Sequence, residues 1–172
     1  MRRGALVLLA ALLALPAAAE TEWRGGSAAD RAEIKAIIAK WEKAYATGDG
    51  QAVADGYDPK GYVMAENAPI AGPDKVAASL IRTFANNDIK MLLDVMEVEF
   101  NGTEVGGWAF IAGRFASKRT PKAATPGVEP RYHAGHFFTL MRKTDAGWKV
   151  WRNVDTSSPD ANYLLDRLKQ GQ

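Results

Sequence analysis

Glu66 and His133 are the two side chains whose type and position best suit acid–base chemistry. Glu66 ends a short run, Gly61–Glu66, that has the composition of a strand. Burial among its apolar neighbours would raise the pKa of its carboxyl group toward a value useful for proton abstraction; a solvated glutamate at a strand end is the alternative. His133 would serve as an acid or base in a pocket, because an imidazole changes charge near neutral pH. Both residues are therefore candidate catalytic groups.

His133 and His136 form an H-x-x-H pattern, a spacing found in metal sites. On a helix this spacing would place both rings on one face. The surrounding segment, 131–143, alternates like a strand instead, and residues three apart on a strand point to opposite faces. No third ligand lies nearby in the sequence, so we predict no metal ion. Because the chain also lacks a glycine-rich phosphate loop and a nucleophile elbow, we predict no cofactor.

A second group of residues is suited to lining a pocket for a small apolar ligand. Arg114 is a charge inside the apolar stretch Trp108–Arg114. It therefore needs an anionic ligand group or a partner such as Asp155 or Glu66. Aromatic residues at such positions form either a pocket wall or plain core. The predicted ligand-binding residues are Trp41, Tyr45, Tyr57, Met64, Trp108, Arg114 and Arg152.

The hydrophobic pattern predicts the elements that position these residues. Apolar residues spaced three and four apart from Ile34 to Tyr45 predict a helix of about 17 residues, which Gly48-Asp49-Gly50 ends. Further helices are predicted at 51–57, 73–84 and 159–168, and strands at 61–66, 89–100, 105–119, 131–143 and 148–155. Helices segregated from long antiparallel strands indicate an α+β fold, in which a curved, cone-shaped sheet wraps around the N-terminal helices and encloses a cavity.

The last two strands form a hairpin whose register decides which side chains share a face. With simple pairing, Met141 opposes Val150 and Thr139 opposes Arg152. Both faces of the hairpin are then apolar, whereas a sheet with one face in solvent has a polar face on that side. We expect helices to cover one face and a second copy of the chain to cover the other, giving a homodimer through the outer sheet face. A slip of one residue would exchange the two faces.

The first 19 residues have the layout of a cleavable secretory leader. Met1-Arg2-Arg3 is cationic, Ala5–Leu15 is apolar, and Pro16-Ala17-Ala18-Ala19 supplies small residues for cleavage. The apolar run is too short to span a bilayer. We expect cleavage after Ala19 and a periplasmic or secreted protein that has no membrane attachment. The remaining chain divides into a flexible linker at 20–29, one domain at 30–158 and a C-terminal helix or tail at 159–172.

Composition excludes several function classes. The chain has 172 residues, 22 Lys and Arg, 20 Asp and Glu, and no Cys. Removing the leader, which holds two Arg and no acid, leaves 20 basic and 20 acidic side chains. A neutral chain lacks the basic face that nucleic-acid binding needs. The absence of Cys excludes disulfides, thiol catalysis and lipid attachment to a leader cysteine.

Four stretches of the chain form a recognisable set. They are Trp41-x-x-Ala44-x-x-x-Gly48-Asp49, Tyr57-Asp58-Pro59, Ile70-Ala71-Gly72 and the run from Arg142 to Asp155 that contains Gly147-Trp148 and Trp151. Together they resemble the nuclear transport factor 2-like superfamily, and within it the SnoaL-like and ketosteroid isomerase-like bacterial proteins. The resemblance extends from about residue 31 to 158 and implies the fold more than the chemistry. Such proteins include isomerases, cyclases, dehydratases, epoxide hydrolases and non-catalytic binding or assembly domains.

The resemblance also implies where isomerase residues would lie. The isomerases carry a Tyr on the first helix, a carboxylate base near the end of the first strand and an acid on the penultimate strand. The matching positions here are Trp41, Glu66 and Thr139, so the classical ketosteroid isomerase reaction is not expected. Two hypotheses remain. One is an exported protein that binds a small apolar molecule, as a cofactor-free isomerase, dehydratase or hydrolase; the other is a non-catalytic binding or assembly module whose cavity is filled by side chains.

Overall fold

The computed structural model describes residues 20–123 and 128–171, so the predicted leader lies outside the described residues. The strands are β1 (Glu22–Arg24), β2 (Tyr57–Ala65), β3 (Asn87–Asn101), β4 (Trp108–Pro121), β5 (Arg131–Thr144) and β6 (Gly147–Ser157). The helices are α1 (Ala28–Thr47), α2 (Gly50–Ala54), α3 (Pro73–Asn86), the short 3₁₀ helix η1 (Pro159–Ala161) and α4 (Asn162–Lys169). The last two cover the range for which the sequence predicts a C-terminal helix.

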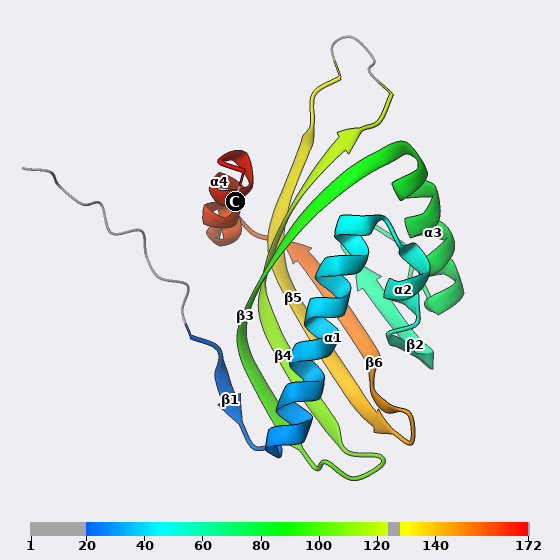
Figure 1. Cartoon of the computed structure of the whole chain (residues 1–172), viewed down its shortest axis with the longest axis vertical. Coiled ribbons are helices and arrows are strands. Elements are labelled where there is room, and N and C mark those ends of the chain that lie inside the picture. The colour runs from blue at the N-terminus through cyan, green and yellow to red at the C-terminus, as the bar shows by residue number, and fades with distance from the viewer. Residues whose placement is uncertain (1–19, 124–127, 172) are drawn as a thin grey trace, which may run out of the picture.

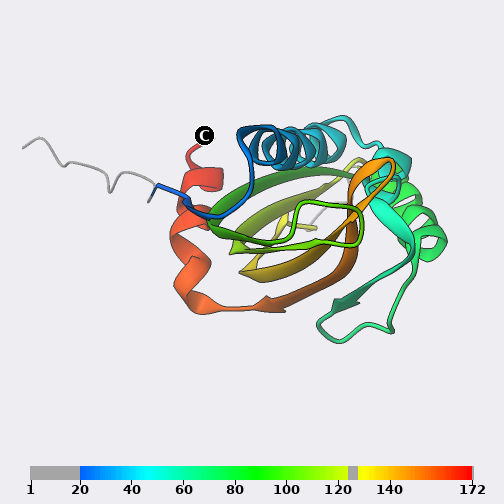
Figure 2. The ribbon, with the colours of Figure 1, turned by 90° about the horizontal axis from the view of Figure 1, so that it is seen from below.

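The six strands form one curved, unclosed sheet in the order β1-β3-β4-β5-β6-β2. Strands β3 to β6 are antiparallel neighbours, whereas β1 and β2 pair in parallel at the two edges. Figure 1 shows α1, α2 and α3 on one side of this sheet and α4 on the other, and Figure 2 shows its curvature. The predicted α+β fold with a curved sheet is confirmed. Strand β1, however, lies inside the segment 20–29 for which the sequence suggests a flexible linker.

Helix α1 begins and ends at residues whose side chains favour those positions. Ser27 accepts a hydrogen bond from the backbone N–H of Asp30 (3.1 Å), and the Asp30 carboxylate accepts one from the backbone N–H of Ser27, which completes a capping box. Gly48 ends the helix in the left-handed conformation that glycine adopts without strain. These two signals fix the length of the helix that crosses the concave face of the sheet.

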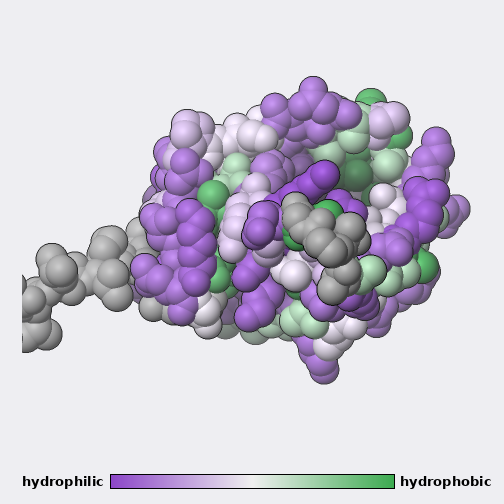
Figure 3. Space-filling view, turned by 90° about the horizontal axis from the view of Figure 1, so that it is seen from above, coloured by the Kyte–Doolittle hydropathy of each residue, from purple (hydrophilic) through white to green (hydrophobic). Residues whose placement is uncertain are grey.

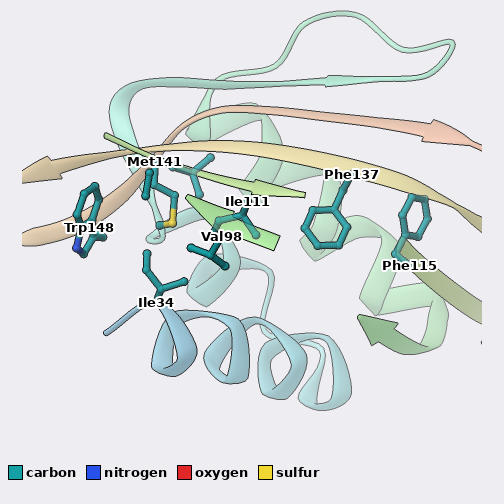
Figure 4. Close-up of a cluster of buried hydrophobic side chains, with 9 residues drawn as sticks. Ile34, Val98, Ile111, Phe115, Phe137, Met141 and Trp148 are labelled. Carbon is teal, nitrogen blue, oxygen red and sulfur yellow. The ribbon is translucent and has the colours of Figure 1, made fainter. Parts of the chain in front are cut away.

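The main hydrophobic core fills the space between α1 and the sheet. Ile34 of α1 is fully buried against sheet residues that include Val98, Ile111 and Met141 (Figure 4). Trp148 at the start of β6 closes the same cluster. Deleting such a side chain removes both its transfer free energy and its packing contacts. The core lies near the N-terminal half of α1, which leaves the C-terminal half free to border a cavity.

A charged network anchors the first turn of α1 to the hairpin between β5 and β6. The Asp30 carboxylate accepts hydrogen bonds from Trp148 Nε1 (3.0 Å) and Lys143 Nζ (3.2 Å). Glu33 accepts from the backbone N–H of Trp148 (2.8 Å) and from Lys143 Nζ (2.7 Å). The bond from Ser27, with those from Trp148 and Lys143, lowers the pKa of Asp30 to about 2. The network therefore holds the helix on the sheet through a buried carboxylate that is fully bonded.

The hairpin register differs from simple pairing at one residue. Met141 opposes Val150, as predicted, but Leu140 opposes Arg152, so Trp151 is an extra residue in β6. The predicted pairing of Thr139 with Arg152 is therefore wrong, because Thr139 opposes Asn153 and Phe137 opposes Asp155. Since alternate residues face opposite sides of a sheet, the bulge turns Asn153 and Asp155 toward the concave face. The same shift turns Arg152 to the outer face.

We predict that Asp30→Asn lowers the free energy of unfolding by about 1–3 kcal/mol at pH 7, because the variant loses charge-assisted hydrogen bonds to Trp148 and Lys143. Since folding lowers the pKa of Asp30 from 3.8 to about 2, its contribution is complete above about pH 4 and is lost as the pH falls toward 2. Urea denaturation at pH 7 and pH 3 measures both effects. Asp145→Asn, in the exposed turn of the same hairpin, is the matched control, and an equal loss in both variants would contradict the anchoring role.

Candidate functional site

A cavity of about 500 Å³ lies between the concave face of the sheet, helices α1 and α3, and the segment 68–71. Figure 3 shows apolar surface in a hollow next to the hydrophilic outer side of α3. Most of the lining is apolar, as in sites that bind small organic molecules. The lining residues used below are Trp41, Tyr45, Tyr57, Lys75, Phe115, Phe137, Thr139, Asn153 and Asp155.

Four polar side chains converge in this cavity from three elements. Tyr45 comes from α1, Tyr57 from β2, and Asn153 and Asp155 from β6. Thr139 Oγ1 donates a hydrogen bond to Asn153 Oδ1 (2.7 Å), which orients the amide and leaves its NH₂ group available to a ligand. Within the described residues, the Asp155 carboxylate and the two tyrosine hydroxyls have no protein hydrogen-bond partner, and no buried side-chain N or O atom is left orphaned. The cavity side is therefore where these three groups can find partners.

The cavity raises the pKa of Asp155, Tyr45 and Tyr57. Burial raises the pKa of the Asp155 carboxyl, the negative charge of Glu66 raises it further, and the positive charge of protonated His133 opposes both. Burial raises the pKa of Tyr45 to about 12 and also raises that of Tyr57. Asp155 is thus a stronger base than an exposed aspartate, whereas both phenols remain protonated hydrogen-bond donors at neutral pH.

Glu66 lies at the edge of this site rather than inside the cavity. Its side chain is exposed and accepts a hydrogen bond from the backbone N–H of Ser157 (2.7 Å). Hydrogen bonds from Ser157 lower the pKa of Glu66, which is the reverse of the increase that burial among apolar neighbours would cause. His133 is also exposed; its Nε2 lies 2.9 Å from Ser157 Oγ, and its ring packs edge-on against Phe115, which does line the cavity. The two candidate catalytic residues therefore meet at Ser157, next to the cavity.

Arg114 lies on the opposite side of the sheet. Its Nε is 3.3 Å from Asp160 of η1, and its NH1 group is 4.0 Å from Asp94 of β3. The expected pairing with Asp155 or Glu66 is therefore wrong. His136 follows the same face and contacts Asp160 (2.8 Å), so the two histidines point to opposite faces as the strand pattern predicts. This cluster fastens the C-terminal helix to the sheet.

Three of the predicted ligand-binding side chains line the cavity, and the other four lie elsewhere. Trp41, Tyr45 and Tyr57 face the cavity. Arg114 is on the outer face, as is Trp108, which borders an outer groove of about 570 Å³ with Phe110, Leu140, Arg142 and Trp151. Arg152 lies over the rings of Tyr62 and Trp151, 3.9 Å from each ring centroid, and Met64 lies between the cavity residues Val63 and Ala65 on the alternate face of β2.

Sequence reasoning missed Asp155, Asn153 and Thr139 as cavity residues. Simple pairing places Asn153 and Asp155 on the outer face, and only the extra residue Trp151 brings them inward. No glycine or proline marks that bulge in the sequence. A recognisable signal is the pair Asn153 and Asp155 on either side of Val154, since two polar residues two apart on a strand share one face.

Within the described ranges, no group of three or more His, Asp or Glu side chains is arranged to hold a metal ion. None of the helices in residues 20–123 and 128–171 is long and apolar enough to cross a membrane.

A curved sheet that encloses a ligand-sized, largely apolar cavity defines a class of small α+β proteins built around an internal pocket. The chain belongs to the SnoaL-like domain family, whose model matches residues 26–154. No curated protein matches the chain.

Solved structures of this class resemble the fold closely. A ketosteroid isomerase-like protein from Erwinia carotovora atroseptica is 27% identical with a TM-score of 0.59, covering 74% of this chain and 96% of its own. A putative scytalone dehydratase from Novosphingobium aromaticivorans is 13% identical with a TM-score of 0.61, covering 76% and 85%. A nuclear transport factor 2-like superfamily protein from Salmonella enterica is 11% identical with a TM-score of 0.62, covering 77% and 93%. The suspected resemblance to this superfamily is confirmed.

Proposed function

We propose that the protein binds one small, mostly apolar and uncharged molecule in the cavity and that Asp155 exchanges a proton with the polar end of that molecule. One observation carries this proposal: a carboxylate without a protein partner faces an apolar cavity beside two protonated phenols. Desolvation makes such a carboxylate a better base, and buried perturbed groups of this kind are characteristic of functional sites. Asp155, rather than Glu66, is then the proton acceptor.

The geometry supports proton transfer that needs no cofactor. Asp155 would take a proton from a carbon next to a ligand carbonyl, and the negative charge would then develop on the carbonyl oxygen. The hydroxyls of Tyr45 and Tyr57, together with the NH₂ group of Asn153, are donors suited to hold that oxygen. Return of the proton to another carbon gives an isomerisation, whereas a hydroxyl on the carbon β to the carbonyl would take the proton held by Asp155 and depart as water, which gives a dehydration. If Asp155 instead takes a proton from bound water, the hydroxide would form a C–O bond to an electrophilic carbon of the ligand, and the oxygen whose bond to that carbon breaks would take the proton from Asp155, which gives a hydrolysis.

The named relatives fit this range of chemistry. One is described as ketosteroid isomerase-like and another as a putative scytalone dehydratase. The position at which the isomerases carry a tyrosine is Trp41 here, which lines the cavity as an aromatic wall. Two tyrosines at other positions, Tyr45 and Tyr57, supply the phenolic donors. We favour this function over the alternative of a binding or assembly module with a filled cavity, because side chains leave about 500 Å³ open.

We predict that Asp155→Asn weakens binding of 2-naphthol, a bicyclic apolar phenol, by about tenfold at pH 7, because its hydroxyl loses a charged hydrogen-bond acceptor. Isothermal titration calorimetry measures the affinity, and Asp166→Asn on the exposed face of α4 is the matched control. In the unmodified protein the affinity should also fall as acid protonates Asp155. Equal affinities of Asp155→Asn and Asp166→Asn for 2-naphthol would contradict the proposed site, as would a failure of the unmodified protein to bind it.

We also propose that the protein is a homodimer through the outer sheet face. Residues that pair across neighbouring strands share a face of the sheet. From β3 to β6, one row on the outer face is Glu99, Phe110, Leu140 and Arg152. The adjacent row is Glu97, Ala112, Phe138 and Val154. Phe110 and Phe138 stack at 5.9 Å, and Phe138 is 43% exposed. A two-fold axis along the strands would bring Glu97 and Glu99 of β3 in one copy over Arg152 of β6 in the other, although Glu99 also lies 3.6 Å from Arg24 of β1. A face that is apolar on β4 and β5 and oppositely charged on the strands to either side is complementary to itself.

We predict that Phe138→Glu weakens this dimer at least tenfold, because a charge would be buried at the centre of the interface. Analytical ultracentrifugation measures the dissociation constant. Ile81→Glu, which adds the same charge to an exposed position on α3, should leave the dimer intact. A monomeric unmodified protein, or equal effects of both substitutions, would overturn the dimer.

We propose, finally, that the protein is exported and acts in the periplasm or outside the cell, on the evidence of the leader-like residues 1–19. Intact mass spectrometry of the protein purified from its own host should give a chain that begins at Glu20. A mass that includes residues 1–19 in the mature protein would contradict export by leader cleavage.

A further inference from the structure

Three strand ends meet beside Asp155 in an arrangement that the proposed proton transfer does not yet use. Glu66 follows the last residue of β2, His133 lies near the start of β5, and Ser157 is the last residue of β6. The backbone N–H of Ser157 donates to Glu66 (2.7 Å), and Ser157 Oγ lies 2.9 Å from His133 Nε2. Ser157 therefore holds one acidic and one basic side chain in fixed positions.

The sheet register places this trio on the same face as Asp155. Gly135 opposes Ser157 and Phe137 opposes Asp155, so His133, two residues before Gly135, continues the cavity-facing row of β5. Gly135 has no side chain, and an added Cβ would lie 1.9 Å from the carbonyl oxygen of Thr156. The backbone of β6 at Thr156 and Ser157 therefore approaches β5 closely at the middle position of this row, between His133 and Phe137.

The groups that face Asp155 come from every element packed around it. Tyr45 of α1 and Tyr57 of β2 are neutral donors, and Lys75 of α3 lines the same cavity but is exposed. Among the salt bridges of the described residues, none includes Glu66 or His133. The two charges of opposite sign that act on the carboxyl are therefore Glu66, which favours its protonated form, and His133, which favours its ionised form when the imidazole is protonated.

We propose that Glu66 and His133 are positioning residues, held in place through Ser157, which set the charge of the Asp155 carboxyl from opposite sides. This inference rests on the proposed function of Asp155 as the group that meets the ligand. It gives both exposed residues a role without contact with the reacting atoms. Burial of Asp155 would then set the pH at which the cavity binds and releases a proton, and the two residues outside the cavity would shift that pH.

The test replaces each charge with a neutral amide that can still bond to Ser157. At a pH where imidazoles ordinarily carry a proton, His133→Gln removes a positive charge and should raise the pKa of Asp155. Glu66→Gln removes a negative charge and should lower it. The titration is followed by ¹³C NMR of the Asp155 carboxyl carbon, assigned by its loss in Asp155→Asn. His136→Gln changes the other histidine, on the outer face, and should leave this titration unchanged.

Ligand affinity should follow the same signs. If each exposed charge changes the proton affinity of Asp155 about threefold, 2-naphthol should bind about twofold more weakly to His133→Gln at the pH where Asp155 is half protonated in the unmodified protein. It should bind about 1.5-fold more tightly to Glu66→Gln under the same conditions. If the two residues only supported the structure, His133→Gln and Glu66→Gln would both bind 2-naphthol more weakly.

The titration separates this inference from the proposed function, because it needs no ligand. Opposite shifts in the two variants support the inference even if 2-naphthol does not bind. Shifts of the same sign, or an unchanged titration in both variants, would overturn it even if Asp155→Asn abolishes binding.

Discussion

The extra residue Trp151 in β6 decides which side chains the cavity contains. On one side of it, Met141 pairs with Val150 inside the hydrophobic core; on the other, Phe137 pairs with Asp155 beside the cavity. Without the bulge, Arg152 and Val154 would take the inward positions, and the cavity would contain a cation in place of a carboxylate. A shift of one residue in a strand reverses the direction of every side chain beyond it. The chemistry of the site therefore depends on the local geometry of a single strand.

The protein holds a buried carboxylate, Asp30, and a half-buried one, Asp155, in opposite environments. At the first turn of α1, Asp30 is surrounded by donors, and its pKa falls to about 2. In the cavity, Asp155 lacks a protein partner among the described residues, and burial raises its pKa. The first arrangement stabilises the fold, because the charge is fully bonded. The second leaves a group whose interactions are completed only by a ligand or water, and the anchoring of α1 and the core around Ile34 hold the cavity open around it.

The sequence was sufficient to predict the architecture and part of the cavity wall. The helical spacing from Ile34 to Tyr45 and the alternation in the four long strands predict elements that match α1 and β3 to β6, because burial imposes those periods directly. Trp41, Tyr45 and Tyr57 lie in the cavity because they belong to elements whose inward face is set by that periodicity. The bulge at Trp151 has no such signal, so the sequence pattern predicts the wrong face for Arg152 and does not reveal Asp155 as a cavity residue. The sequence also does not predict the partners of Arg114, because they depend on where the C-terminal helix packs.

A crystal structure of the protein with 2-naphthol tests the central claim most directly. The account predicts one molecule in the cavity, with its rings between the aromatic side chains of α1 and β5 and its hydroxyl within hydrogen-bond distance of the Asp155 carboxylate. A molecule bound only in the outer groove beside Trp108 and Trp151, or a cavity closed by side chains in the crystal, would contradict it.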